Sequence, residues 1–121
     1  AKQSIVGDTE ARFKTKTGHY VKNKAEKMIA NFLFENGMIF QYDMAVTWAD
    51  KDDFKTSFFI PKLDLYLEHF KFNNEDNFKK IMKEKIKQYE KSKKKLVYTT
   101  YDDESNVEEA LKIKMKPYIV L

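Results

Sequence analysis

The chain has 121 residues, 42% of them hydrophobic and 15% aromatic, which is enough for one folded domain with its own core and excludes a disordered chain. It contains no cysteine, which excludes a disulfide framework and a zinc site built from thiolates. Its net charge is +4, no run approaches the roughly 20 apolar residues of a membrane span, and nothing resembles a signal peptide.

These exclusions favour a cytoplasmic protein that has no membrane partner. The first residue is Ala1 rather than Met, so we expect the chain to be a processed or excised piece of a longer protein. Residues 1–19 are polar and weakly patterned, and we interpret them as a lead-in. Residues 20–121 are then expected to form a single domain.

Helical spacing begins at about Tyr20 and continues to Asn36, since apolar residues recur three and four positions apart. Gly37 follows, where a glycine commonly terminates a helix. A β-rich run at residues 38–46 predicts the first strand, and the polar residues 49–53 predict the turn after it.

The next two strands are predicted at residues 54–60 and 63–70. Only two residues separate them, so we expect them to pair as a hairpin. Within the second of these strands, Asp64 and Glu68 are expected to lie on one face, because side chains along a strand alternate between faces.

Three further elements follow in the order helix, strand, helix, at residues 75–91, 95–100 and 105–115. The last helix opens with a capping box of Ser105 and Glu108, and residues 118–121 are interpreted as the start of a final strand. The predicted order is therefore α-β-β-β-α-β-α, a mixed α/β fold in which helices flank a central mixed sheet. Three consecutive strands argue against a doubly wound parallel sheet.

Ionisable residues occupy packing faces in the first two predicted helices. Glu26 lies on or beside the apolar stripe of the first helix. Lys85 falls within the apolar stripe of the second, which consists of Phe78, Ile81, Met82, Ile86 and Tyr89. Because a charge on a packing face is unfavourable unless it is paired or metal-bound, we expect these two residues to converge with Asp64 and Glu68.

Converging carboxylates bind a hard divalent cation, Mg²⁺ or Mn²⁺, through their oxygens. Such a cation activates a water molecule and stabilises charge on a scissile phosphate, and a nearby lysine stabilises the same charge. That chemistry is typical of a phosphodiester nuclease. For each acid taken singly, the alternative is that it pairs with a lysine or reaches solvent at the edge of the fold.

The lysines are concentrated in one part of the chain. Between Lys71 and Lys95 there are ten lysines against four acids, an excess of six positive charges that is larger than the excess of the whole chain. A basic stripe attracts a phosphate backbone, so DNA is the expected partner, although a solvated helix face is the alternative. The candidate contacts are Lys79, Lys80, Lys83 and Lys87.

Three stretches of the chain together resemble the PD-(D/E)XK nuclease superfamily, and more closely the nuclease-like domain carried by some superfamily 1 DNA helicases. They read "VKNKAEKMIANFLFENGMIFQYD", "FFIPKLDLYLEHF" and "MKEKIKQY", in that order, and the resemblance covers residues 20–101. It implies a restriction-endonuclease-like core, DNA as the substrate, Mg²⁺ or Mn²⁺ as the cofactor, and a helicase domain as a partner in the same or another chain.

The resemblance also implies roles for individual residues. Glu26 corresponds to the helix acid and Glu68 to the strand acid of the (D/E)XK element. Phe70 occupies the usual lysine position two residues after Glu68, so Lys85 on the following helix is the residue that would serve as the lysine.

Ser57 departs from the family pattern, because it stands where the metal-binding aspartate is expected. A hydroxyl is a poorer ligand for Mg²⁺ than a carboxylate. Three interpretations are open: Asp64 compensates, the domain binds DNA without cutting it, or the serine is an engineered inactivating change. Asp64 lies about 13 Å from Glu68 along a regular strand, too far for both to hold one ion directly.

Three functions therefore compete. The first is a metal-dependent DNA nuclease, in which Glu68 and the residue at position 57 hold the cation, Glu26 supports it and Lys85 assists the attacking water. The second is a non-catalytic DNA-binding module on the same fold, which Ser57 favours. The third is a protein-interaction domain whose basic helix meets an acidic partner.

Overall fold

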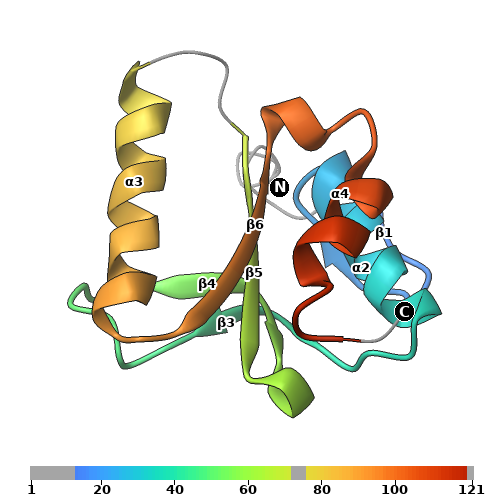
Figure 1. The fold of residues 1–121 in the computed structure, drawn as a ribbon, viewed down its shortest axis with the longest axis horizontal. Helices are drawn as coiled ribbons and strands as arrows, with labels where there is room; N and C mark the ends of the chain where they lie inside the picture. Colours follow the sequence, from blue (N-terminus) through green and yellow to red (C-terminus); the bar gives the residue numbers. More distant parts are fainter. Residues whose placement is uncertain (1–12, 72–75, 120–121) are drawn as a thin grey trace, which may run out of the picture.

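A computed structural model describes residues 13–71 and 76–119 of the chain. Its main feature is a four-stranded sheet in the order β3–β4–β5–β6, flanked by helices (Figure 1). The strands are β3 (Gln41–Ala45), β4 (Lys55–Ile60), β5 (Leu65–Phe70) and β6 (Lys95–Thr100). Strands β3, β4 and β5 are antiparallel neighbours, whereas β5 and β6 are parallel. The prediction of a mixed sheet is therefore confirmed.

Within residues 13–71 and 76–119, three helices accompany the sheet, namely α2 (Lys24–Glu35), α3 (Asp76–Lys91) and α4 (Val107–Met115). Helix α3 is the crossover that parallel strands such as β5 and β6 require. Figure 1 shows α2 and α4 together on one side of β5 and β6, and α3 on the other. Within the described ranges, no helix is long and apolar enough to cross a membrane.

Hydrophobic side chains form two clusters, one toward each group of helices. Leu65 and Leu67 belong to the larger cluster, together with residues of α2 and α4. Tyr66 points the other way and packs with Tyr89 of α3 in the smaller cluster. Since strand side chains alternate, Glu68 lies on the same side as Tyr66 and faces α3.

Helix α2 has a well-defined cap at each end. The side chain of Asn23 accepts a hydrogen bond from the backbone N–H of Glu26 at 2.8 Å, which satisfies one of the free donors of the first turn. At the other end Gly37 has φ of +70°, and the N–H of Met38 donates to the carbonyl of Leu33 at 2.8 Å. This glycine-terminated cap confirms the predicted end of the helix.

The start of this helix was predicted too early. Strand β2 (Tyr20–Val21) pairs with β1 (Phe13–Lys14), so the chain is extended at Tyr20 and becomes helical only at Lys24. Part of the predicted lead-in therefore belongs to a small two-stranded sheet. Residues 1–12 lie outside the described part of the chain.

The loop between β4 and β5 also differs from the prediction. A short 3₁₀ turn, η1 (Pro61–Leu63), follows β4, and Asp64 closes it with φ of +51°. Strand β5 therefore begins only at Leu65, and Asp64 is an exposed turn residue rather than part of the strand. The antiparallel pairing of β4 with β5 is as predicted.

Two expectations near the end of the chain are wrong. The N-terminal cap of α4 is Asn106, whose side chain accepts from the N–H of Glu109 at 3.4 Å, so the predicted Ser105 box does not form. Tyr118 and Ile119 are not in a strand, and residues 120–121 lie outside the described residues.

Helix α3 is packed mainly through its C-terminal half. Tyr89 is fully buried, but Phe78 and Ile81 are 42% and 58% exposed. The predicted packing stripe is therefore wrong for the first turns, because their apolar residues have no covering layer within the described part of the chain.

A turn after β6 is held by an aspartate and a lysine. Asp103, the last residue of η2 (Tyr101–Asp103), accepts hydrogen bonds from the N–H of Thr100 at 2.9 Å and from Lys114 Nζ at 3.2 Å. Lys114 Nζ also donates to the carbonyl of Tyr98 in β6 at 2.7 Å. Burial alone would raise the pKa of Asp103, but the Thr100 N–H and the Lys114 ammonium outweigh it and hold the pKa below its usual value.

Replacing this residue, Asp103→Asn, is expected to lower the free energy of unfolding by about 1 kcal/mol at neutral pH. The folded-state pKa is depressed, so the stabilisation is present above the unfolded-state pKa and is lost as the pH falls through the folded-state value. Urea denaturation at about pH 7 and about pH 3 measures this difference, which should shrink at the lower pH. The exposed neighbour provides the control, Asp102→Asn, which should have little effect at either pH.

Candidate functional site at the fork between β4 and β5

The strands β4 and β5 separate at one end of their pairing. Their backbone register runs from Ile60 opposite Leu65 to Phe58 opposite Leu67. At the next position the N–H of Ser57 donates to a carboxylate oxygen of Glu68 at 3.3 Å instead of to a backbone carbonyl. The side chain of Glu68 therefore fills the fork between the two strands.

The carboxylate of Glu68 is buried and surrounded by donors. Its side chain is 1% exposed, and Oε1 accepts from the Ser57 hydroxyl at 2.5 Å. Oε2 accepts from the Ser57 N–H, from the Tyr89 hydroxyl and from Lys85 Nζ, the last at 3.0 Å. A buried charge is tolerated only when it is paired and hydrogen-bonded in this way.

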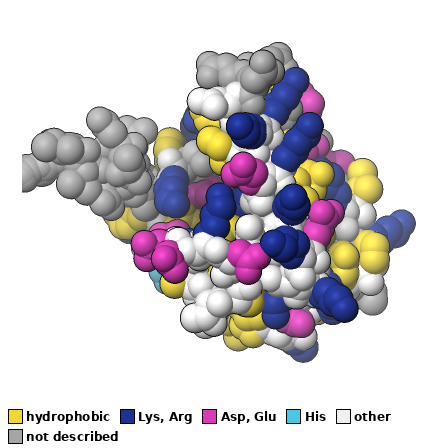
Figure 2. All heavy atoms as spheres, turned by 90° about the vertical axis from the view of Figure 1, so that its left-hand side faces the viewer, with side chains coloured by type: hydrophobic (Ala, Val, Ile, Leu, Met, Phe, Trp, Pro, Cys, Tyr) yellow, Lys and Arg dark blue, Asp and Glu magenta, His cyan; other side chains and the backbone are white. Residues whose placement is uncertain are grey.

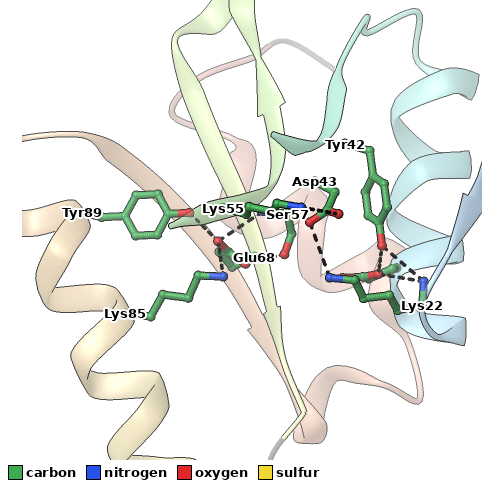
Figure 3. A network of polar contacts seen from close by, with 9 residues as sticks. Lys22, Tyr42, Asp43, Lys55, Ser57, Glu68, Lys85 and Tyr89 are labelled. Atoms are coloured by element: carbon green, nitrogen blue, oxygen red, sulfur yellow. Dashed lines mark hydrogen bonds and ion pairs between the residues drawn. The ribbon is translucent and has the colours of Figure 1, made fainter. Parts of the chain in front are cut away.

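Helix α3 supplies two of these donors from consecutive turns, Lys85 and Tyr89 (Figure 3). Burial first, and then the charge of Glu68, raise the pKa of Tyr89, so its phenol keeps its proton and donates to Glu68. The same phenol oxygen lies 2.7 Å from Oγ1 of Thr56. The side chain of Lys85 remains 27% exposed, so it reaches solvent while its ammonium group pairs with the buried carboxylate.

A second buried carboxylate belongs to Glu26, near the start of α2. It is 4% exposed, and its Oε1 accepts from the Tyr42 hydroxyl at 2.5 Å and from the N–H of Lys22 at 3.1 Å. Burial first, and then the bond to Glu26, raise the pKa of Tyr42 and keep it a donor. Both inward-facing acids are thus satisfied by protein donors.

Sequence reasoning missed a third acidic residue, Asp43 in β3. It lies between the residue pairs Tyr42–Phe58 and Met44–Thr56, and so across from Ser57. Its carboxylate is within 3.5 Å of Lys22 Nζ and 3.7 Å of Lys55 Nζ. The available signal was its position inside a β-rich run, where aspartate is uncommon.

The structure brings together only some of the predicted site residues. Glu68, Lys85 and Ser57 are in direct contact, whereas Glu26 lies in its own cluster with Tyr42 and Lys22, in the first turn of α2. Asp64 sits in the turn before β5, at the other end of that strand from Glu68, so it does not join the site as predicted. The four lysines proposed for DNA are all exposed on α3, at Lys79, Lys80, Lys83 and Lys87.

The residues present do not fit Mg²⁺ or Mn²⁺. Within residues 13–71 and 76–119, no three histidine, aspartate or glutamate side chains are arranged to hold a metal ion. The oxygens of Glu68 already accept four hydrogen bonds or ion pairs, and Ser57 offers a hydroxyl that donates to Glu68. A divalent cation would have to displace these donors.

In the fork, the ammonium group of Lys85 balances the charge of the Glu68 carboxylate, which also accepts hydrogen bonds from the hydroxyl groups of Ser57 and Tyr89. Such an arrangement stabilises the junction between α3 and the sheet. Comparisons of the chain with protein-family models, with curated proteins and with solved structures return no match.

Proposed function

We propose that this chain is a DNA-binding domain on a nuclease-like core, and that it binds DNA without cutting it. The observation that carries the proposal is the exposed basic face of α3. Lys79, Lys83 and Lys87 are spaced four residues apart, so they share one side of the helix, and Lys80 is beside them. Among the described residues, Lys80, Lys83 and Lys87 form no ion pair, so their charges are available to phosphates.

Figure 2 views the molecule from the side of α3 and shows its lysine side chains spread over this face, with acidic residues between them. An exposed basic face of this kind matches the sequence-independent binding of a phosphate backbone. The carboxylate oxygens of Glu68 are occupied by Ser57, Tyr89 and Lys85. This supports binding without hydrolysis, because a catalytic cation needs carboxylate oxygens that are free to coordinate it.

The nuclease-like core is supported by two features that the family resemblance implies. One is the order of the elements along the chain, in which α2 precedes the antiparallel strands β3, β4 and β5, and α3 then leads to β6. The other is the contact between Glu68 and Lys85, in which the lysine comes from the helix rather than from the strand. A helicase domain, in this or another chain, is the partner that the same resemblance suggests.

The test compares two matched pairs of charge-removing substitutions. Lys83→Gln with Lys87→Gln removes two charges from α3, and Lys112→Gln with Lys116→Gln removes two exposed charges, also four residues apart, from the α4 region. Affinity for duplex DNA is measured between roughly 50 and 200 mM salt. The α3 pair should make the slope of log affinity against log salt shallower by about 1.8, since each phosphate contact contributes roughly 0.9.

The α4 pair should leave that slope almost unchanged. Equal effects of the two pairs would mean that only net charge matters and would contradict a binding face on α3. Absence of DNA binding by the wild-type chain would overturn the proposal and favour an acidic protein as the partner of this helix.

Metal-dependent cleavage of DNA is the second candidate function. It is favoured by the Glu68–Lys85 pair, because a lysine beside the strand acid is the arrangement that hydrolysis of a phosphodiester uses. Against it stand Ser57 and the occupied oxygens of Glu68.

A further inference from the structure

Asp43 holds two lysines that come from different parts of the chain. Lys22 follows β2 at the entrance to α2, and Lys55 is the first residue of β4. Their Nζ atoms lie 3.5 Å and 3.7 Å from the two carboxylate oxygens of Asp43, one lysine on each oxygen. The fold has therefore assembled a pair of ammonium groups around one acid, beside the fork that contains Ser57 and Glu68.

The backbone at Asp43 is in an unusual conformation for the middle of a strand. Its φ is +54°, in the left-handed region that residues other than glycine enter at some cost, aspartate and asparagine less than most. Non-glycine residues held in that region concentrate at functional sites. The conformation allows the carboxylate to reach both Lys22 and Lys55.

The two ion pairs are exposed enough to be exchanged. The side chains of Lys22, Lys55 and Asp43 are 49%, 56% and 33% exposed. Ion pairs at such exposure contribute little to stability, because water and salt screen them. A phosphate could therefore replace the carboxylate as the partner of both lysines without disturbing the core.

We infer that Lys22 and Lys55 form a phosphate-binding pair, that Asp43 occupies this pair in the free protein, and that the backbone phosphates of bound DNA displace it. The inference rests on the proposed function and extends it, because it locates a second contact on the far side of Ser57 from α3. Figure 3 shows Asp43 next to Ser57, between the side chains that come from α3 and those at the start of α2. DNA that contacts both sets of lysines would pass over the fork.

The substitution Asp43→Asn tests the inference, because asparagine has the same shape and tolerates a positive φ. It should tighten DNA binding about fivefold at low salt, since it releases two weakly held lysines. Asp53→Asn is the matched control: Asp53 also has a positive φ, of +59°, is exposed, and forms no ion pair among the described residues. The control should change affinity less than twofold.

The effect must also depend on the two lysines. Lys22→Gln with Lys55→Gln should weaken DNA binding, and adding Asp43→Asn to that pair should then have no effect. If Asp43→Asn is poorly folded, the inference is still tested by the double variant Lys22→Gln with Lys55→Gln. Its DNA affinity should fall further than that of the α4 pair, Lys112→Gln with Lys116→Gln.

The outcomes separate the two proposals. One outcome is that the α3 substitutions weaken DNA binding while Asp43→Asn and the substitutions of Lys22 and Lys55 leave it unchanged. That outcome would overturn this inference and leave the proposed function standing. Absence of binding by both the wild-type protein and Asp43→Asn would overturn both proposals.

Discussion

Replacing Lys85 with methionine is expected to lower the free energy of unfolding by about 3 kcal/mol, which is a large part of the stability of a domain of this size. The carboxylate of Glu68 has a side-chain exposure of 1%, and Lys85 is its only cationic partner among the described residues. Methionine keeps most of the length of the side chain and removes the charge, so the buried carboxylate of Glu68 loses its cationic partner and keeps only the neutral donors of Ser57 and Tyr89.

Urea denaturation of Lys85→Met measures this loss, and Lys87→Met is the matched control from the same helix. Lys87 is exposed and forms no ion pair among the described residues, so its replacement should change stability by less than about 0.5 kcal/mol. A double-mutant cycle with Glu68→Gln then isolates the energy of the pair. Equal stability of the two lysine variants would contradict the buried ion pair.

The second large effect is expected from Ser57→Asp. The change removes the hydroxyl that donates to Glu68 and places a second carboxylate beside the first, so without a divalent cation the protein should lose about 3 kcal/mol of stability. The two carboxylates then form the kind of oxygen site that Mg²⁺ and Mn²⁺ prefer. Saturating Mn²⁺, at about 100 times its Kd, should restore about 2.7 kcal/mol.

Thermal unfolding with and without Mn²⁺ checks this prediction, and cleavage of single- and double-stranded DNA is measured on the same samples. Ser105→Asp is the control, because Ser105 is exposed and lies in the turn before α4 rather than on β4 or β5, and it should show no response to the cation. A wild-type protein that is itself stabilised by Mn²⁺ and cuts DNA would show that the serine site assembles a metal, and the nuclease candidate would replace the binding module.

Much of the fold follows from residue pattern because the relevant interactions are local. The order of strands and helices, the glycine at the end of α2 and the burial of Glu26 all follow from spacing and from the residue types that helices and strands accept. The contact between Glu68 and Lys85 was expected because a lysine on a packing face needs a partner.

The errors arise where tertiary contacts or turn geometry decide. Asp64 reads as part of a strand, but the 3₁₀ turn that starts at Pro61 uses it as the closing residue with positive φ. Phe78 and Ile81 fit a packing stripe, yet nothing in the described part of the chain covers them. Sequence spacing shows which face of a helix is apolar but not how far a neighbouring layer extends.

Asp43 could not be found from spacing at all. Its importance depends on Lys22, which is 21 residues before it in the sequence, and on Lys55, which is 12 residues after it. The pairing of β3 with β4 brings Lys55 close, and the path of the chain into α2 brings Lys22 close. A single aspartate in a β-rich run carries no information about such distant partners.

The contact between Lys114 and β6 has a consequence for the behaviour of the protein at high concentration. Strand β6 is the outermost strand of the described sheet on that side, and an open edge of this kind can pair with a strand of another molecule. Lys114 Nζ occupies the carbonyl of Tyr98 at the middle of that edge and places a positive charge there. The lysine therefore opposes intermolecular strand addition at this edge, and with it aggregation.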